Sequence, residues 1–228
     1  MDISTNFDLE KKEEHHHHWL LPGSIRCIVV GPSGCDKTNL LFNLLLKKGH
    51  LNFDCVHLYS KTLGQDKYQI LRDWAEDLKE VVGREVVTFH NNSDDIIEVE
   101  ALDPKERSIM LFDDVLDANQ SPIEKYFTRG RHGGADSFYL TQKYFHVPNI
   151  IRENANLIII FAMKGKSLSN IHTSILDEDE IPLKEFKDFC RKCWSQPYGV
   201  AVIDLDSDAF NGKYRCGFDR FYTPKSSN

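Results

Sequence analysis

Short runs of apolar residues recur along the chain and alternate with stretches in which apolar residues repeat every three or four positions. The short runs are rich in valine and isoleucine and lack polar alternation, which is typical of strands buried on both faces of a parallel sheet. They predict strands over residues 25–30, 56–59, 85–89, 108–112, 137–140, 157–161 and 199–205. The helical spacing predicts helices over residues 39–48, 68–82, 121–131 and 183–194. This alternation predicts an α/β fold with a mostly parallel central sheet and helices on both faces.

The composition supports one folded domain with short extensions. The chain has 228 residues, of which 41% are hydrophobic and 28% charged, and this is enough to bury a core without disulfides or metal. We expect an acidic, histidine-containing disordered tail over residues 1–18, a domain over 19–207 and a C-terminal extension over 208–228. The four histidines from His15 to His18 could bind a metal or be part of an expression tag. Because they lie within a polar leader, we interpret them as solvated and without a specific role.

The apolar segments and cysteines point to an intracellular protein without a membrane span. The longest apolar run, residues 157–163, is far shorter than the roughly 20 residues that cross a bilayer. The first 20 residues lack an apolar signal core, so secretion is not expected. Six cysteines in 228 residues are too few for a disulfide scaffold, so we expect them to be reduced thiols. Cys190 and Cys193, with Cys216 downstream, are possible zinc ligands, but one pair on a helix favours free thiols here too.

Charge is unevenly distributed along the chain. The net charge of −7 does not by itself indicate a nucleic-acid partner. Residues 119–175, however, hold seven basic and three acidic residues, whereas residues 92–118 hold nine acids and two bases. Lys164 and Lys166 belong to this basic stretch and suit either a channel-facing loop or a solvated turn. Basic and aromatic residues alternate over 211–225, which fits either a nucleic-acid backbone or a strand at the sheet edge.

A glycine-rich segment between the first strand and the first helix carries the clearest chemistry. The segment reads G-P-S-G-C-D-K-T over residues 31–38, in the strand–loop–helix context of a P-loop. Its backbone N–H groups and the helix N-terminus form an anion site, Lys37 suits the β- and γ-phosphates, and Thr38 suits Mg²⁺. The expected nucleotide-binding residues are Gly31, Pro32, Ser33, Gly34, Cys35, Asp36, Lys37, Thr38 and Asn39.

Asp36 departs from the P-loop pattern, which has glycine at this position. Aspartate adds a Cβ and a negative charge beside a polyphosphate. At 4 Å and an effective dielectric near 20, one like-charge pair costs about 4 kcal/mol before screening. This repulsion predicts a nucleotide affinity lowered by roughly two or three orders of magnitude.

Two further strands end in polar residues that suit ATP hydrolysis. Asp113 and Asp114 follow the strand over 108–112, where the first acid would hold Mg²⁺ and the second would act as the base for the attacking water. Thr141 and Gln142 follow the next strand, beside the acidic pair, where Gln142 would touch the γ-phosphate or the water. Acids and polar pairs are common at strand ends, so these interpretations depend on the P-loop upstream.

Arginines between these strands are candidates for a group acting in a neighbouring subunit. Arg129 and Arg131 lie in the segment T-R-G-R-H, and Arg152 is a third candidate. An arginine reaching into a neighbour's site stabilises the γ-phosphate in the transition state. A solvated helix end explains any single one of these arginines equally well.

The motifs in this order resemble a known family. After the P-loop and the Asp-Asp strand come F-T-R-G-R-H, Y-L-T-Q-K-Y-F and P-N-I-I-R-E-N-A-N-L-I-I-I-F. Over residues 21–205 the chain resembles the poxvirus A32-type DNA-packaging ATPases of the FtsK–HerA superfamily, closest to those of virophages, adintoviruses and Polinton elements. The resemblance implies a RecA-like P-loop fold, with ATP and Mg²⁺ as cofactors. It also implies a homo-oligomeric ring, double-stranded DNA and a viral capsid protein as partners, and a virus assembly site in host cytoplasm or nucleus.

The resemblance also assigns roles to residues. Lys37, Thr38, Asp113 and Asp114 become the ATP and Mg²⁺ residues, and Gln142 the glutamine sensor; Arg129 or Arg131 becomes the trans-acting finger. The first hypothesis is therefore an ATP-driven DNA translocase that packages a viral genome. The alternative is an impaired endogenous relic, motivated by Asp36, that keeps the fold, assembly or DNA binding. A small-molecule kinase shares the P-loop, but the acidic strand and Gln142 argue against it.

Overall fold

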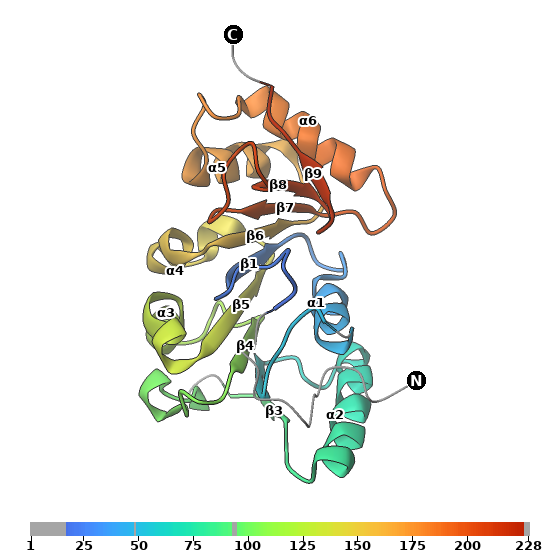
Figure 1. Cartoon of the computed structure of the whole chain (residues 1–228), viewed down its shortest axis with the longest axis vertical. Coiled ribbons are helices and arrows are strands. Elements are labelled where there is room, and N and C mark those ends of the chain that lie inside the picture. Colours follow the sequence, from blue (N-terminus) through green and yellow to red (C-terminus); the bar gives the residue numbers. More distant parts are fainter. Residues whose placement is uncertain (1–16, 48, 93–94, 226–228) are drawn as a thin grey trace.

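A nine-stranded sheet in the order β3-β2-β4-β5-β1-β6-β7-β8-β9 forms the centre of the molecule (Figure 1). The structure is a computed structural model and describes residues 17–47, 49–92 and 95–225. The first six strands of this order, from β3 to β6, pair in parallel with their neighbours. Strands β7, β8 and β9 extend the sheet by antiparallel pairing. The strands are β1 (Arg26–Val30), β2 (Cys55–Ser60), β3 (Val87–His90), β4 (Ser108–Asp113), β5 (Ala135–Thr141), β6 (Leu157–Ile160), β7 (Ala201–Asp204), β8 (Tyr214–Cys216) and β9 (Arg220–Tyr222). The mostly parallel α/β fold expected from the sequence is confirmed.

Helices cover both faces of the sheet. Helices α1 and α2 lie on one face, and α3 to α6 pack on the other (Figure 1). The core is accordingly divided into two clusters, and β1 contributes alternate residues to each: Ile28 and Val30 face one, Cys27 and Val29 the other. The α-helices are α1 (Lys37–Leu46), α2 (Gln69–Val82), α3 (Ser121–Arg129), α4 (Asn149–Asn154), α5 (Gly165–Ile175) and α6 (Leu183–Trp194). Short 3₁₀ turns include η1 (Asp66–Tyr68) and η4 (Gly130–Gly133).

Some elements differ from the sequence prediction. Helix α5 was not expected; its first residues include the supposed loop lysine Lys166, and Lys164 precedes it as the N-cap. Lys164 and Lys166 are both exposed at this helix start, so the backbone here begins a helix and does not form the expected loop or turn. The aromatic C-terminal segment forms β8 and β9, in agreement with the sheet-edge interpretation of residues 211–225.

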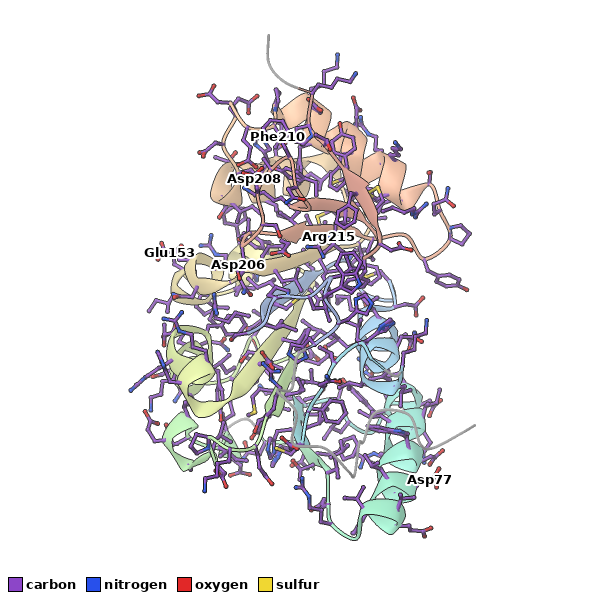
Figure 2. The ribbon with its side chains drawn as sticks, viewed as in Figure 1. Asp77, Glu153, Asp206, Asp208, Phe210 and Arg215 are labelled. Atoms are coloured by element: carbon purple, nitrogen blue, oxygen red, sulfur yellow. A yellow bond between two sulfur atoms is a disulfide. The ribbon has the colours of Figure 1, made fainter. Side chains whose placement is uncertain are left out.

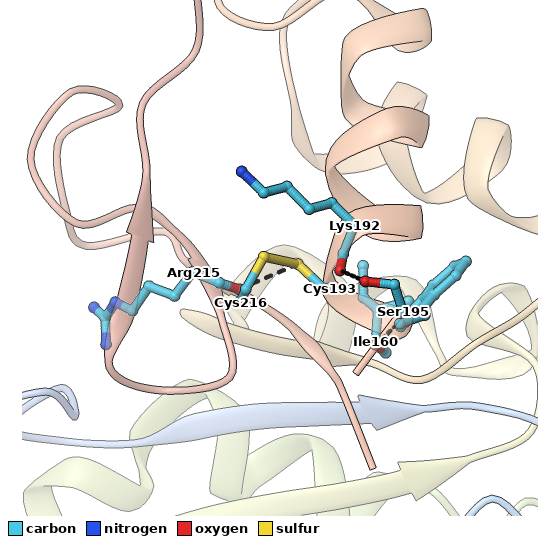
Figure 3. The surroundings of a disulfide bond; sticks show 7 residues. Ile160, Lys192, Cys193, Ser195, Arg215 and Cys216 are labelled. Atoms are coloured by element: carbon cyan, nitrogen blue, oxygen red, sulfur yellow. Dashed lines mark hydrogen bonds between the residues drawn. A yellow bond between two sulfur atoms is a disulfide. The ribbon is translucent and has the colours of Figure 1, made fainter. Parts of the chain in front are cut away.

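The expectation of reduced thiols is wrong for two of the six cysteines. Cys193 of α6 is bonded to Cys216 of β8, with a Cα–Cα separation of 4.7 Å (Figure 3). Cys27, Cys35, Cys55 and Cys190 are free. The sequence did not show the pairing because it depends on β8, which brings residue 216 under α6. Cys193 and Cys216, two of the three possible zinc ligands, are bonded to each other instead.

His17 corrects the expectation of a solvated histidine run. Its ring is buried, with Nε2 2.8 Å from Asp136 Oδ2 and Nδ1 accepting a hydrogen bond from the backbone of Asn52. Asp136 also forms an ion pair with Arg107, whose Nε lies 3.1 Å from Asp136 Oδ2. His17 therefore attaches the N-terminal segment to the start of β5. His15 and His16 lie outside the described residues.

A buried arginine attaches the two ends of the chain to each other. Arg215 of β8, labelled in Figure 2, is 3% exposed. It pairs with Asp204 of β7 and donates a hydrogen bond to the carbonyl of Leu20. Nearby, the rings of Trp19 and Phe221 lie 6.5 Å apart. The antiparallel extension and the segment before β1 thus form one unit with the parallel sheet. Among the described residues, no helix combines the length and the apolar character needed to cross a bilayer.

Candidate nucleotide site

The glycine-rich loop connects the carboxyl end of β1 to the start of α1. Gly31 is required by close packing, because a Cβ there would lie 2.5 Å from Phe161 Cβ and 2.6 Å from Cys35 Sγ. Gly34 has a φ of 72°, a conformation that glycine adopts without steric cost. The loop wraps the N-terminus of α1, where unpaired backbone N–H groups and the helix dipole favour an anion. The expected strand–loop–helix arrangement is therefore present.

Lys37 lies across the loop. Its ammonium group donates hydrogen bonds to the carbonyls of Gly31 at 2.8 Å and Pro32 at 2.9 Å. Cys35 Sγ is 3.7 Å away, and burial raises the pKa of the Cys35 thiol even though Lys37 opposes the shift. Cys35 is therefore a neutral thiol beside the lysine at neutral pH, and the cationic charge of Lys37 stays available to an anion in the loop.

Asp36 adopts the left-handed conformation that glycine takes in the standard pattern. Its φ is 66° and its ψ 26°, a region that aspartate tolerates better than most residues with a Cβ. The side chain is exposed, and its Oδ1 accepts a hydrogen bond from Asn39 Nδ2 at 2.9 Å. The backbone of the loop is thus kept, and the carboxylate is hydrogen-bonded to Asn39 in the first turn of α1 at the solvent-exposed edge of the site. Solvent screening makes the 4 kcal/mol estimate for its repulsion too large.

Asp113 is the centre of a hydrogen-bond network beside the loop. It ends β4 and is 7% exposed, and its Oδ2 accepts hydrogen bonds from Thr38 Oγ1 at 3.0 Å and Tyr68 OH at 2.7 Å. The ammonium of Lys67 lies 3.1 Å from the same oxygen and 3.3 Å from Thr38 Oγ1. Burial lowers the pKa of Lys67, but the interactions with Asp113 and Tyr68 together outweigh burial, so the net shift is upward and Lys67 is cationic. Burial, then Asp113, raises the pKa of the Tyr68 phenol.

A cavity of about 220 Å³ collects the expected residues. Asp114 lines it in a left-handed conformation, with a φ of 59°, and its side chain is exposed. Such backbone strain is common where a side chain must be aimed at a ligand. Gln142 follows β5 and borders both this cavity and a second one of about 720 Å³ on the other side of the loop. The expected residues that line the first cavity are Ser33, Gly34, Cys35, Asp36, Lys37, Thr38, Asn39, Asp113, Asp114 and Gln142.

The two candidate finger arginines lie elsewhere. Arg129 ends α3 and pairs with Glu100 at 2.9 Å, and Arg131 is exposed in η4. Both precede β5, whereas the loop follows the opposite, carboxyl edge of the parallel strands. Seven residues of β5 separate these edges by roughly 23 Å, so neither arginine reaches the site of its own chain. Action on a neighbouring subunit stays a prediction.

Lys67 and Tyr68 were missed by the sequence analysis. They lie in η1, after β2, and β2 pairs with β4 so that Ser60 is opposite Asp113. A signal was present, because the carboxyl ends of neighbouring parallel strands meet at one sheet edge. Using it required knowing that β2 is the neighbour of β4, which the sequence alone does not state.

With this geometry, comparison with known proteins becomes informative. The family model described as Poxvirus A32 protein matches residues 12–216. The chain belongs to the Poxvirus A32 protein family. No curated protein sequence matches it.

Solved structures share the fold of this A32 family member. The genome packaging NTPase B204 of Sulfolobus turreted icosahedral virus 2, in complex with sulfate, is 16% identical, with a TM-score of 0.59 over 89% of this chain and 100% of that one. Its complex with ATP-gammaS is 17% identical, with a TM-score of 0.55 over 82% and 94%. B204, the DNA-packaging ATPase of Sulfolobus turreted icosahedral virus, is 16% identical, with a TM-score of 0.54 over 79% and 92%. At these identities the likeness shows a common fold.

Proposed function

We propose that this A32 family member is an ATPase that drives double-stranded DNA into a viral capsid. The observation that carries the proposal is the convergence of Lys37, Thr38, Asp113, Asp114 and Gln142 on one cavity at the carboxyl edge of the sheet. The P-loop supplies binding, and the two acidic positions and the glutamine supply the groups that hydrolysis requires. Family membership and the fold shared with viral packaging NTPases support the packaging role.

Mg²⁺ fits the donors at this site. Thr38 Oγ1 and Asp113 Oδ2 are hard oxygens 3.0 Å apart, and a lysine ammonium already lies against both, so the position suits a cation. Thr38 would hold the ion directly and Asp113 through water. When bound, the ion neutralises charge on the β- and γ-phosphates.

The remaining residues have distinct roles in the proposed reaction. Lys37 would exchange its bonds to the Gly31 and Pro32 carbonyls for the phosphates. Asp114 would accept the proton of the attacking water, and Gln142, at the end of the neighbouring strand, would orient that water. Arg129 or Arg131 would act on the site of the next subunit of a homo-oligomeric ring. The locally basic stretch over residues 119–175 and the exposed lysines at the start of α5 would face the DNA.

An impaired relic is the second candidate, and Asp36 is the observation that favours it. Such a protein would keep the fold, assembly or DNA binding without turnover.

Steady-state ATP hydrolysis with and without double-stranded DNA tests the proposal. We expect DNA to stimulate the native chain, and Asp114→Asn to lower turnover by at least about 100-fold while ATPγS binding persists. Asp117→Asn is the control, since Asp117 is an exposed acid on the same loop that does not line the cavity. Absence of turnover in an assembled ring, with or without DNA, would refute the translocase and leave the relic.

A further inference from the structure

Lys67 occupies an unusual position in the candidate site. Its ammonium lies 3.3 Å from Thr38 Oγ1 and 3.1 Å from Asp113 Oδ2, the two atoms that the proposed function gives to Mg²⁺. The side chain comes from η1 of the same chain and lines the cavity together with Lys37 and Asp114. The structure thus shows a second lysine in the phosphate cavity, in addition to the lysine of the P-loop.

The surroundings of Lys67 fix its backbone and leave its ammonium able to move. The next residue, Tyr68, is fully buried, and its hydroxyl is hydrogen-bonded to Asp113 and Ser60. These hydrogen bonds hold η1 against the ends of β2 and β4. The side chain of Lys67, by contrast, is one-third exposed. Asp113 keeps the hydrogen bonds from Thr38 and Tyr68 when the lysine leaves, so departure of the ammonium leaves no carboxylate buried without a partner.

Two cations cannot share the oxygens of Thr38 and Asp113. A magnesium ion arriving with ATP would repel the ammonium by Coulomb's law, and the lysine would move to the nearest available negative charge. A triphosphate bound in the cavity would supply the largest concentration of negative charge there, and Lys67 already lies beside Asp113 in the cavity lining. Asp114 directly follows Asp113 and lines the same cavity, so a γ-phosphate placed for Asp114 to activate a water would lie near Lys67.

We propose that Lys67 is a catalytic residue that contacts the γ-phosphate of ATP bound to its own subunit. In the free protein it holds Thr38 and Asp113 in place. During hydrolysis the water oxygen bonds to the γ-phosphorus, the bond to the β–γ bridging oxygen breaks, ADP keeps the electron pair, and Asp114 takes the proton. Lys67 stabilises the negative charge on the γ-phosphoryl oxygens during this exchange. The inference rests on the proposed function, since it requires ATP in this cavity.

The test compares affinities for ATPγS and ADP, each with Mg²⁺, in the native chain and in Lys67→Met. Because only ATPγS has a γ-phosphate, we expect Lys67→Met to weaken ATPγS binding by about 10- to 100-fold and to leave ADP binding within about twofold. Lys61→Met is the matched control, since Lys61 is an exposed lysine on the same loop that does not line the cavity. Lys67→Arg, which keeps the charge, is expected to retain most of the preference for ATPγS.

The outcomes separate this inference from the proposed function. If the native chain binds ATPγS and Lys67→Met weakens both nucleotides equally, or neither, then Lys67 only positions Asp113 and the inference is overturned. If the native chain binds neither nucleotide, the proposed function fails and the inference fails with it. Thermal unfolding of each variant verifies that the fold is kept, and Lys67→Arg supplies the same comparison if Lys67→Met does not fold.

Discussion

Replacing Asp36 tests how the P-loop tolerates a residue that its pattern excludes. The structure separates two effects of this aspartate. The backbone already has the left-handed conformation that the loop needs, so Asp36→Gly should leave the loop geometry unchanged. The carboxylate is the remaining obstacle, because it adds a negative charge near the phosphates. Asp36→Asn isolates this charge, since asparagine tolerates the same conformation and its amide oxygen can still accept the hydrogen bond from Asn39.

The expected magnitude follows from the exposure of the side chain. For a carboxylate 4 Å from a phosphate charge, the repulsion is about 4 kcal/mol at an effective dielectric of 20 and about 1 kcal/mol in bulk water. Asp36 is exposed and hydrogen-bonded to Asn39, so water screens its charge and the repulsion lies near the second value. A penalty of about 1 kcal/mol corresponds to roughly a fivefold change in affinity. We therefore expect both variants to tighten ATPγS binding about five- to tenfold.

Isothermal titration calorimetry of the native chain, Asp36→Gly and Asp36→Asn at two salt concentrations measures this effect. The gain should shrink as salt rises, because exposed charges are screened. Asp66→Asn is a control that removes an exposed acid from η1 without touching the loop. A gain of a hundredfold or more in both variants would refute the reasoning, since it would mean that the carboxylate faces the phosphates in a poorly screened position. A gain in Asp36→Gly alone would show that backbone conformation, not charge, limits binding.

Three further predictions concern stability. The disulfide between Cys193 and Cys216 closes a loop with a sequence separation of 23. Reduction of this bond, or Cys216→Ser, should lower the free energy of unfolding by about 3 kcal/mol. If reductant destabilises Cys216→Ser as much as it destabilises the native chain, this expectation is contradicted. Burial, and then the charge of His90, lowers the pKa of His57 to about 4 in the folded protein. Between pH 6.5 and 4, His57 is therefore protonated in the unfolded chain but neutral in the folded one. Stability should therefore fall by up to about 3 kcal/mol as the pH drops from 6.5 to 4, and urea unfolding of His57→Asn should show a smaller drop. Arg215→Met should cost about 3–5 kcal/mol in chemical unfolding, because it leaves the Asp204 carboxylate buried without its partner; a cost below 1 kcal/mol would show that Asp204 finds water.

The sequence was most informative where each strand is buried on both faces. Strands β1, β4 and β6 contain continuous apolar runs, so their positions and the P-loop after β1 could be predicted directly. Helix α5 was missed because its first residues, G-K-S-L-S-N, carry few apolar positions and few strong helix formers. Tertiary contacts supply what this local pattern lacks, since Leu168 and Ile171 are buried in the core.

The parts of the site that the sequence did not predict depend on long-range neighbours. Lys67 becomes part of the site only because β2 lies beside β4. His17 is buried only because Asp136, the second residue of β5, lies where the N-terminal segment passes. The pairing of Cys193 with Cys216 likewise needs the antiparallel hairpin of β8 and β9. In each case the residue type was visible, and the spatial neighbour was not.

The position of β1 has a consequence for how the protein acquires its site during synthesis. Its partners come late in the chain: Arg26 pairs with Ser137, and Cys27 with Leu157. Contacts of such high sequence separation form slowly, and they are impossible until the ribosome has released the second partner. The loop over residues 31–38 is therefore translated early but gains its supporting strands only after about two-thirds of the chain has emerged. A product truncated before residue 157 would contain every residue of the P-loop and still lack one side of the sheet that shapes it.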